Sequence, residues 1–318
     1  MKYQSPRWLP GGHLQTIYPA LWIPKPEVSF RRERWQTPDN DFIDIDFVDG
    51  NPGQPLVVLF HGLEGSSESH YARALMAAVQ ARGWSGAIPH FRGCSGQLNQ
   101  APRFYHSGDA QEINWILRRL KSQRQQQHPD AHFFAAGVSL GGNALLRWLG
   151  EYQHEAEIVQ AACAISAPLD LAQGGASLSS GFNMLYTRMF LKTLKPKCLQ
   201  KLNQYPSLFD RNRLLEAKNL YEFDNVVTAP LHGYLDTDDY WYRASARHVL
   251  QDITLPTLVL NAKNDPFLPG QYLPQNAAPC VTLDYPQHGG HVGFANGNVP
   301  GRLTWLPEKI LHFFDKAI

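Results

Sequence analysis

The sequence lacks an excess of charge of either sign. Its 318 residues include 29 lysines and arginines against 28 aspartates and glutamates, which gives a formal net charge of +1. Nonspecific binding to nucleic acid depends on a basic surface, so we expect no nucleic-acid partner. Hydrophobic residues make up 43% of the chain, too many for a disordered protein. The length fits one large α/β domain or two smaller ones.

Long apolar runs are also absent. No stretch approaches the 18 consecutive apolar residues expected of a membrane-spanning helix. The N-terminal sequence MKYQSPRWLPGGHLQ has no apolar segment of the kind found in secretory signals. The four cysteines lie far apart, and none belongs to a C-x-x-C pair: Cys94, Cys163, Cys198 and Cys280. Together these absences predict a cytoplasmic protein with buried, reduced thiols.

Common cofactor motifs are missing as well. The 13 histidines include no H-E-x-x-H, so a zinc hydrolase is not indicated. Neither G-x-x-x-x-G-K-[ST] nor G-x-G-x-x-G occurs, so no nucleotide is implied. We therefore expect no metal and no cofactor, and no feature of the sequence indicates an oligomeric state.

Short apolar runs predict a mostly parallel central sheet. Each has four or five residues and suits a strand covered on both faces: 56–60, 133–136, 161–165 and 257–260. The segment 41–50 alternates instead, with Ile43 and Ile45 on one face and Asp44 and Asp46 on the other. That alternation predicts a half-buried, antiparallel strand.

Helical patterns alternate with these strands. Apolar residues recur at helical spacing in four segments: 69–82, 109–121, 140–152 and 303–317. The alternation breaks between about 169 and 250, where we expect a mostly helical insertion. The sequence thus predicts an α/β fold, with a mostly parallel sheet flanked by helices. We expect a single domain over 1–318, with a helical cap at 169–250.

One serine lies between a predicted strand and a predicted helix. Gly137-Val138-Ser139-Leu140-Gly141 has the pattern G-x-S-x-G in the context that a nucleophile elbow requires. Small residues must flank the serine because the turn is tight. The helix N-terminus directs free N–H groups toward any negative charge that forms there. We predict that Ser139 is a catalytic nucleophile.

A serine nucleophile needs a base, and the base needs an orienting acid. Sites of this kind on α/β sheets place the three in the order serine, acid, histidine. Asp265 follows the strand at 257–260, and His291 follows a candidate strand at 281–283. We favour these two because strand ends assemble α/β sites and because glycines before His291 free its imidazole. The alternatives to them are Asp170, Asp236 and His288.

An oxyanion hole completes a site of this type. The loop 61–65, His-Gly-Leu-Glu-Gly, follows the strand at 56–60, and its turn can direct an N–H group toward a developing alkoxide. We predict the backbone N–H groups of Leu63 and Leu140 as the donors. The His61 side chain is interpreted as structural, fixing the loop by hydrogen bonds.

With these residues in place, the sequence resembles the YheT-like branch (AB hydrolase 4 family) of the α/β-hydrolase superfamily. The shared motifs follow in order along nearly the whole chain: PRWLPGGHLQT, LFHGLEGSSESHY, HFRGCSG, YHSGD, GVSLGGN, NAKNDPF and HGGHVGF. The resemblance implies an α/β-hydrolase fold and places nucleophile, acid and base at Ser139, Asp265 and His291. It also implies an esterase for carboxylic esters with short- and medium-chain acyl groups.

Two other functions fit the same residues. An alcohol acyltransferase, as found among eukaryotic relatives of this branch, passes the acyl group from the serine to an alcohol instead of water. A non-catalytic binding module on a hydrolase scaffold is the other, although such proteins usually lose a triad member. We predict an ester hydrolase with an acyl-enzyme, acting on a small-molecule acyl ester or lipid-derived ester.

The insertion carries predictions of its own. Apolar residues at helical spacing near its start are candidates for an acyl pocket: Met184, Leu185, Met189 and Phe190. Residues 171–209 contain five basic residues and no acid, a net of +5, which leaves −4 for the rest of the chain. A solvated basic face is the usual meaning of such a run. Contact of 188–201 with a membrane surface is an alternative that we do not predict.

Overall fold

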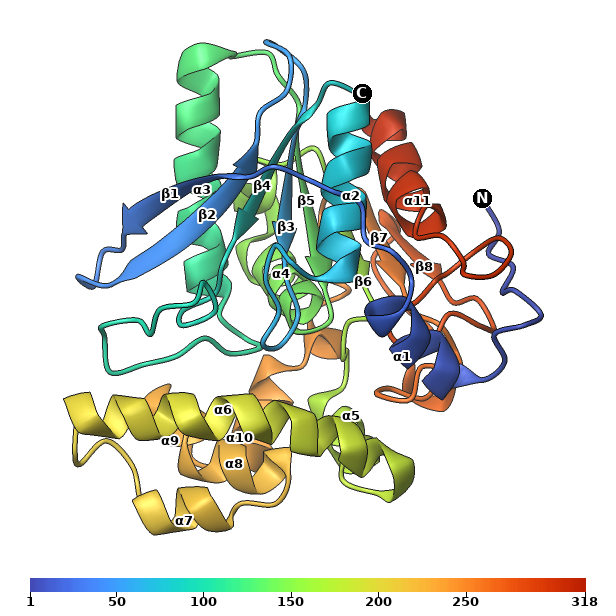
Figure 1. The fold of residues 1–318 in the computed structure, drawn as a ribbon. Coiled ribbons are helices and arrows are strands. Elements are labelled where there is room, and N and C mark those ends of the chain that lie inside the picture. Colours follow the sequence, from blue (N-terminus) through green and yellow to red (C-terminus); the bar gives the residue numbers. More distant parts are fainter.

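An eight-stranded sheet runs through the centre of the computed structural model, which describes residues 1–318 (Figure 1). The strands are β1 (Arg31–Gln36), β2 (Phe42–Val48), β3 (Leu56–Phe60), β4 (Ser85–Pro89), β5 (Phe133–Val138), β6 (Ala161–Ile165), β7 (Thr257–Leu260) and β8 (Val281–Asp284). Their order is β1-β2-β4-β3-β5-β6-β7-β8. β2 pairs antiparallel with β1 and β4, and every other pair is parallel. The prediction of a mostly parallel sheet is confirmed.

Helices cover both faces of the sheet. Two lie on each face: α2 (His70–Ala81) and α11 (Trp305–Phe314) on one, α3 (Ala110–Gln127) and α4 (Leu140–Tyr152) on the other. Successive side chains of a strand point to opposite faces. Val57 of β3 therefore joins the core beside α2, and Val58 joins the core beside α3 and α4. The continuous apolar runs arise because both faces of these strands are covered.

Shorter segments complete the core. Helix α1 (Gly12–Leu21) lies beside the loops that follow β7 and β8, near the lower end of the sheet in Figure 1. Helix α1, which contains Pro19, is not among the helices predicted from the sequence. Five 3-10 segments occupy connections: η1 (Gln153–Ala156), η2 (Gly181–Asn183), η3 (Ala246–His248), η4 (Gly270–Tyr272) and η5 (Asp315–Ala317).

The alternating strand β2 is more buried than predicted. Its apolar face packs in the core as expected, but Asp44 and Asp46 on the opposite face are each only 2% exposed. Arg34 of β1 binds Asp44 at 2.8 Å, and Arg32 binds Asp46 at 2.7 Å. The prediction of a half-buried strand is wrong because arginines from β1 cover and neutralise these carboxylates.

Between β6 and β7 the chain contains only helices. They form a layer beyond the carboxyl ends of the parallel strands, at the bottom of Figure 1: α5 (Leu171–Leu178), α6 (Met184–Gln204), α7 (Arg211–Glu216), α8 (Leu220–Val226), α9 (Thr228–Leu231) and α10 (Thr237–Ala244). We call residues 169–250 the cap segment. No helix of the protein, α6 included, combines the length and the apolar character needed to cross a membrane.

Two lysines of α6 attach the cap segment to the core. The Lys197 ammonium binds the Glu64 carboxylate at 2.7 Å, and the Lys201 ammonium donates hydrogen bonds to the carbonyl oxygens of Asn99 and Ala101. Lys201 is fully buried, and burial lowers its pKa to about 8. The interpretation of a solvated basic face is therefore wrong for Lys201, which is buried, while Lys197 is 28% exposed but paired with Glu64.

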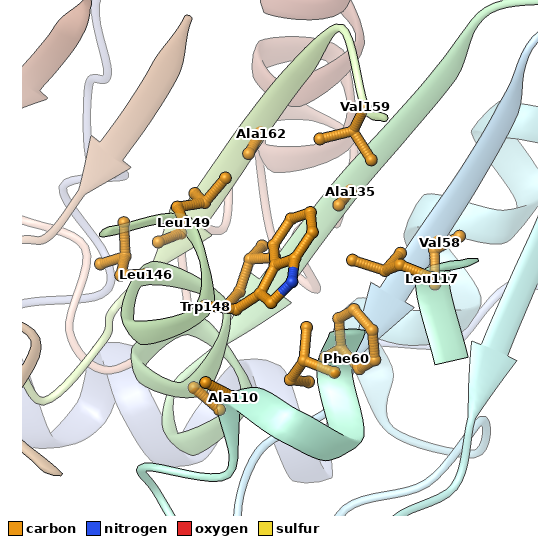
Figure 2. Close-up of a cluster of buried hydrophobic side chains, with 14 of the residues drawn as sticks. Val58, Phe60, Ala110, Leu117, Ala135, Leu146, Trp148, Leu149, Val159 and Ala162 are labelled. Carbon is orange, nitrogen blue, oxygen red and sulfur yellow. The ribbon is translucent and has the colours of Figure 1, made fainter. Parts of the chain in front are cut away.

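Trp148 of α4 lies in the centre of the core on the α3 side (Figure 2). Its indole is surrounded by side chains from β3, β5 and α3, among them Phe60, Ala135 and Leu117. Its Nε1 donates a hydrogen bond to Asn114 Oδ1 at 3.1 Å. The ring is fully buried, so its contacts have no counterpart in the unfolded chain.

We expect Trp148→Ala to lower the free energy of unfolding by about 3–5 kcal/mol, because the lost indole leaves a cavity that the packed sheet cannot close. Urea denaturation measures the change. As a control, Trp22→Ala removes the same side chain from a position 57% exposed and costs less than about 0.5 kcal/mol. Equal losses in the two variants would contradict the assignment of Trp148 to the core.

Candidate active site

Ser139 lies at the turn between β5 and α4. Its φ of 53° and ψ of −121° form a conformation that is uncommon outside glycine. The Ser139 N–H donates a hydrogen bond to the Ile165 carbonyl oxygen of β6 at 2.8 Å. Gly141 allows α4 to begin close against β3, because a Cβ there would meet the carbonyl oxygens of Phe60 and His61. The turn therefore holds the serine at the carboxyl end of the sheet.

A histidine and an aspartate from two other loops reach this serine. His291 follows β8 and places its Nε2 2.9 Å from Ser139 Oγ. Asp265 follows β7, and its Oδ2 lies 2.9 Å from His291 Nδ1. A carboxylate accepts hydrogen bonds, so Nδ1 carries the proton and Nε2 accepts from the serine hydroxyl. The structure thus brings the three predicted side chains into one hydrogen-bonded chain.

Phe267 holds both the aspartate and the histidine. Its backbone N–H donates a hydrogen bond to Asp265 Oδ1 at 2.8 Å. Its ring stacks on the His291 imidazole, with ring centres 3.9 Å apart and planes inclined by 15°. The Asp265 side chain is 1% exposed and the His291 side chain 10%. Water therefore has little access to the hydrogen bond between acid and base.

The alternative acids and the alternative histidine lie elsewhere. Asp170 and Asp236 cap the N-termini of α5 and α10, where each accepts a hydrogen bond from a first-turn N–H group. Asp170 also forms an ion pair with Arg247. His288 lies near Asn264, with 3.5 Å between their side-chain nitrogens. None of the three contacts Ser139.

The two predicted oxyanion donors flank the serine. Leu63 and Leu140 both line the cavity that contains Ser139. Leu140 is the first residue of α4, where N–H groups have no partner within the helix. The N–H group of Leu63 has no hydrogen-bond partner in the protein. Both groups are therefore free to bind an oxygen atom placed beside Ser139.

His61 fixes the loop that carries Leu63. Its Nε2 accepts a hydrogen bond from the Phe91 N–H at 3.0 Å, and its Nδ1 donates to the Gly62 carbonyl oxygen at 2.8 Å. Burial lowers the pKa of His61 to about 3, so the imidazole is neutral. It connects the loops after β3 and β4 and holds the backbone near Ser139 in place.

A largely apolar cavity lies between Ser139 and the cap segment. It encloses about 1090 Å³ of space, counted with the solvent at its mouth. Side chains from α5, α6, α8 and α10 form its cap side: Leu171, Leu178, Phe190, Leu194, Phe223 and Trp241. An acyl group in this cavity would have apolar side chains along its length and its carbonyl beside Ser139.

Only one of the four predicted pocket residues lines this cavity. Phe190 does, whereas Met184, Leu185 and Met189 lie outside the lining. Leu185 and Met189 are 44% and 55% exposed. Helical spacing gives the faces of α6 but not the face that rests on the core. Tertiary contacts of α6, such as the Lys197 ion pair, set that orientation.

The other lining residues of the cap segment were not predicted. Most come from α5, α8, α9 and α10, which meet α6 only in the folded protein, and α6 itself adds Leu194, Lys197 and Cys198. The one available signal was the run AQGGASLSSG at 172–181. Its small residues let α5 approach closely, and Gly175 lies directly against the Trp241 indole.

Besides Glu64, which pairs with Lys197, one further carboxyl group lines the cavity, that of Asp224 in α8. Burial raises its pKa to about 6, although it accepts hydrogen bonds from the Thr228 hydroxyl at 2.5 Å and the Trp241 indole at 2.9 Å. No basic side chain pairs with it. No group of three or more histidine, cysteine, aspartate or glutamate side chains in the protein is arranged to hold a metal ion.

Comparison with known protein families identifies the class of the protein. The family described as alpha/beta hydrolase fold matches residues 55–297, from β3 to the loop that carries His291. The chain belongs to the α/β-hydrolase family, and the fold-class prediction is confirmed. The esterase Pf2001 of Pyrococcus furiosus has a similar solved structure, with a TM-score of 0.56 and 16% identity over 92% of this chain and 99% of that one.

Sequence similarity narrows the family. The chain is 40% identical to "Putative esterase YheT" of Escherichia coli (strain K12), over 94% of this chain and 88% of that protein. It therefore belongs to the YheT-like branch. It is 29% identical to "Phospholipase ABHD3" of Homo sapiens, over 99% of this chain and 79% of that protein. It is 25% identical to "Monoacylglycerol lipase" of Saccharomyces cerevisiae, over 89% of this chain and 63% of that protein.

We expect Asp224→Asn to stabilise the protein at neutral pH and to change little at pH 4. The folded-state pKa of about 6 exceeds the unfolded-state value of about 3.9, so the folded protein loses stability as pH rises between them. The asparagine can accept from the Trp241 indole through Oδ1 and donate to the Thr228 hydroxyl oxygen through Nδ2, so both contacts are kept. Thermal unfolding should show a gain of about 3 kcal/mol at pH 8 and little change at pH 4.

The matched control is Asp252→Asn, at an exposed position. It should leave the unfolding temperature unchanged at both pH values. A stabilisation by Asp224→Asn that is equal at pH 4 and pH 8 would show that the carboxyl group of Asp224 is not its cause.

Proposed function

We propose that the protein hydrolyses carboxylic esters through a covalent acyl-enzyme on Ser139. The observation that carries the proposal is the hydrogen-bonded chain from Asp265 through His291 to the serine hydroxyl, which ends in the apolar cavity. The names of its relatives, an esterase, a phospholipase and a monoacylglycerol lipase, support the same class of reaction.

Acylation begins with attack of Ser139 Oγ on the carbonyl carbon of the ester. His291 Nε2 takes the hydroxyl proton as the new C–O bond forms, and Asp265 stabilises the imidazolium. The negative charge on the former carbonyl oxygen accepts hydrogen bonds from the N–H groups of Leu63 and Leu140. The bond to the alcohol then breaks, and the leaving alcohol takes the proton from His291.

Deacylation repeats these steps with water. His291 removes a proton from water as its oxygen attacks the acyl carbon, and the same two N–H groups bind the oxyanion. Collapse releases the carboxylic acid and returns the proton to Ser139 Oγ. The enzyme is unchanged at the end of the cycle, so no further reactant is needed.

The apolar lining of the cavity supports an acyl ester as substrate, and the resemblance to YheT-like esterases suggests a short- to medium-chain acyl group. Phe190, Leu194 and Phe223 form an apolar wall, and each buried methylene group adds about 0.8 kcal/mol to binding. The Lys197 ammonium at the same cavity is neutralised by Glu64, so it exerts little attraction on an anionic substrate. The substrate we propose is a small-molecule acyl ester or a lipid-derived ester.

We assign the choice of acyl chain to the cap segment, residues 169–250, within a single hydrolase domain over 1–318. The catalytic side chains come from loops of the core, whereas much of the cavity wall comes from the cap helices. Lys197 and Lys201 hold α6 to the core, which keeps that wall next to the serine. Changes in the wall should therefore alter chain preference without altering the chemistry.

We expect Ser139→Ala to reduce turnover of p-nitrophenyl butyrate by about 10⁴-fold or more, because the acyl-enzyme cannot form. Initial rates from released nitrophenol measure the loss, and circular dichroism checks folding. The control Ser180→Ala, at an exposed position of the cap segment, should keep full activity. Wild-type turnover by a folded Ser139→Ala protein would refute the proposed function. Product analysis with ethanol present separates release of acid from formation of an ethyl ester.

We expect Phe190→Trp to shift the preferred p-nitrophenyl ester to a shorter acyl chain, because a larger ring fills part of the cavity. Measurement of kcat/KM across acyl lengths should show a loss of about tenfold or more for the longest good substrate. Met189→Trp is the matched control, since the adjacent side chain points away from the cavity and is 55% exposed. Identical chain-length profiles for the two variants would remove Phe190 from the acyl site.

A further inference from the structure

Helix α1 lies against both loops that carry the acid and the base. We propose that Gln15 and Thr16 of α1 are positioning residues that hold Asp265 and His291 in register with each other and with Ser139. The proposal rests on the proposed function of these three residues. Helix α1 lies outside residues 55–297, the part of the chain that matches the family. Its hydrogen bonds to the acid and histidine loops therefore come from a segment that the family match does not include.

Gln15 connects the acid loop to the histidine loop. It is 1% exposed, and its Oε1 accepts two hydrogen bonds, from Asn264 Nδ2 at 2.9 Å and from the Gly289 N–H at 2.8 Å. Asn264 immediately precedes Asp265, and Gly289 lies two residues before His291. The Gln15 Nε2 donates to the Leu9 carbonyl oxygen at 2.8 Å, which fixes the amide in this orientation.

Thr16 holds the histidine itself. The backbone N–H of His291 donates a hydrogen bond to Thr16 Oγ1 at 2.9 Å. The Thr16 hydroxyl donates in turn to the Gly12 carbonyl oxygen at 2.7 Å, so its lone pairs are directed at the histidine backbone. The contact joins residues 275 positions apart in the chain. It fixes the backbone from which the imidazole extends to Ser139.

The fit between α1 and the histidine loop leaves no space between them. At Gly293, a Cβ atom would overlap the Gln15 carbonyl oxygen, so only glycine allows this approach. The segment 285–304, which carries His291, contains no helix or strand. It therefore has no regular hydrogen-bonding pattern of its own to set the direction of the imidazole, and α1 supplies part of that restraint.

Small displacements of a catalytic base are costly. A shift of about 1 Å at a reacting group can lower the rate by about 100-fold. Substrate binding depends on the cavity wall, which α1 does not form. Loss of the hydrogen bonds from α1 should therefore lower kcat while KM changes little. A general loss of stability does not lower kcat selectively in this way.

The experiment compares two substitutions at Thr16. Thr16→Val keeps the shape of the side chain but removes the hydroxyl, and Thr16→Ser keeps the hydroxyl. We expect Thr16→Val to lower kcat for p-nitrophenyl butyrate by about 10- to 100-fold, with KM within about twofold. Thr16→Ser should restore most of the rate. The rate of Ser139 labelling by a fluorophosphonate should fall in parallel with kcat.

Thr37→Val is the matched control. Thr37 is also buried, and its hydroxyl accepts a hydrogen bond from the Asp41 N–H at 3.1 Å, in the turn between β1 and β2 at the other edge of the sheet. This variant should lose comparable stability in urea denaturation but keep the wild-type kcat. An equal fall in kcat for Thr37→Val and Thr16→Val would overturn the proposal, because reduced stability of the folded protein would then explain the lower kcat of both variants.

A second readout does not depend on ester hydrolysis. The proton on His291 Nδ1, bound to Asp265, should give a far-downfield proton NMR signal, assigned by its absence in His291→Gln. We expect the signal in the wild type and Thr16→Ser, and its loss or broadening in Thr16→Val. A sharp, unchanged signal in Thr16→Val would overturn the proposal that Thr16 positions His291. If the wild type shows no esterase activity but its NMR signal is still lost in Thr16→Val, the proposed function is rejected and the positioning role of Thr16 is kept.

Discussion

The turn between β5 and α4 fixes the position of Ser139, and the surrounding sheet, helices and loops are arranged around it. Ser139 sits there with a positive φ, hydrogen-bonded to β6, while Gly141 lets α4 start against the end of β3. Such a backbone is stable only if neighbouring elements enforce it. The parallel strands, covered on both faces by helices, supply that enforcement. They also bring the loops after β3, β7 and β8 to the same edge, where the other site residues lie.

The positive charges of the cap segment include two lysines that bind the core. The near-zero net charge conceals a segment, 171–209, that is rich in lysine and free of acid. Within it, Lys197 and Lys201 reach into the core, one to a carboxylate beside the candidate oxyanion loop and one to backbone carbonyl oxygens. The cap segment is thus attached by polar contacts at one end of a cavity whose walls are otherwise mainly apolar. Asp224 is the carboxyl group there without a basic partner.

Much of the fold could be predicted from local pattern. The apolar runs at 56–60 and 257–260 coincide with β3 and β7. A strand that is buried on both faces needs apolar residues at every position, so it appears in the sequence as a continuous apolar run. Position along the chain also indicated Ser139, Asp265 and His291, since each follows a strand. Predictions from the sequence pattern were wrong where contacts with another strand or helix determine whether a side chain is exposed. Asp44 and Asp46 look solvated in sequence but are covered by arginines of β1.

From the sequence alone came the α/β class, the alternation of the core strands and helices, and the three residues that meet at the candidate site. These depend on periodicity and on strand ends, both of which are local properties of the chain. The packing of α6 on the core sets which of its faces lines the cavity, so that Phe190 does and Met189 does not. The tertiary structure alone revealed that α1 binds the loops of Asp265 and His291. Contacts between residues up to 275 positions apart have no periodic signature, because they arise only when the folded elements pack together.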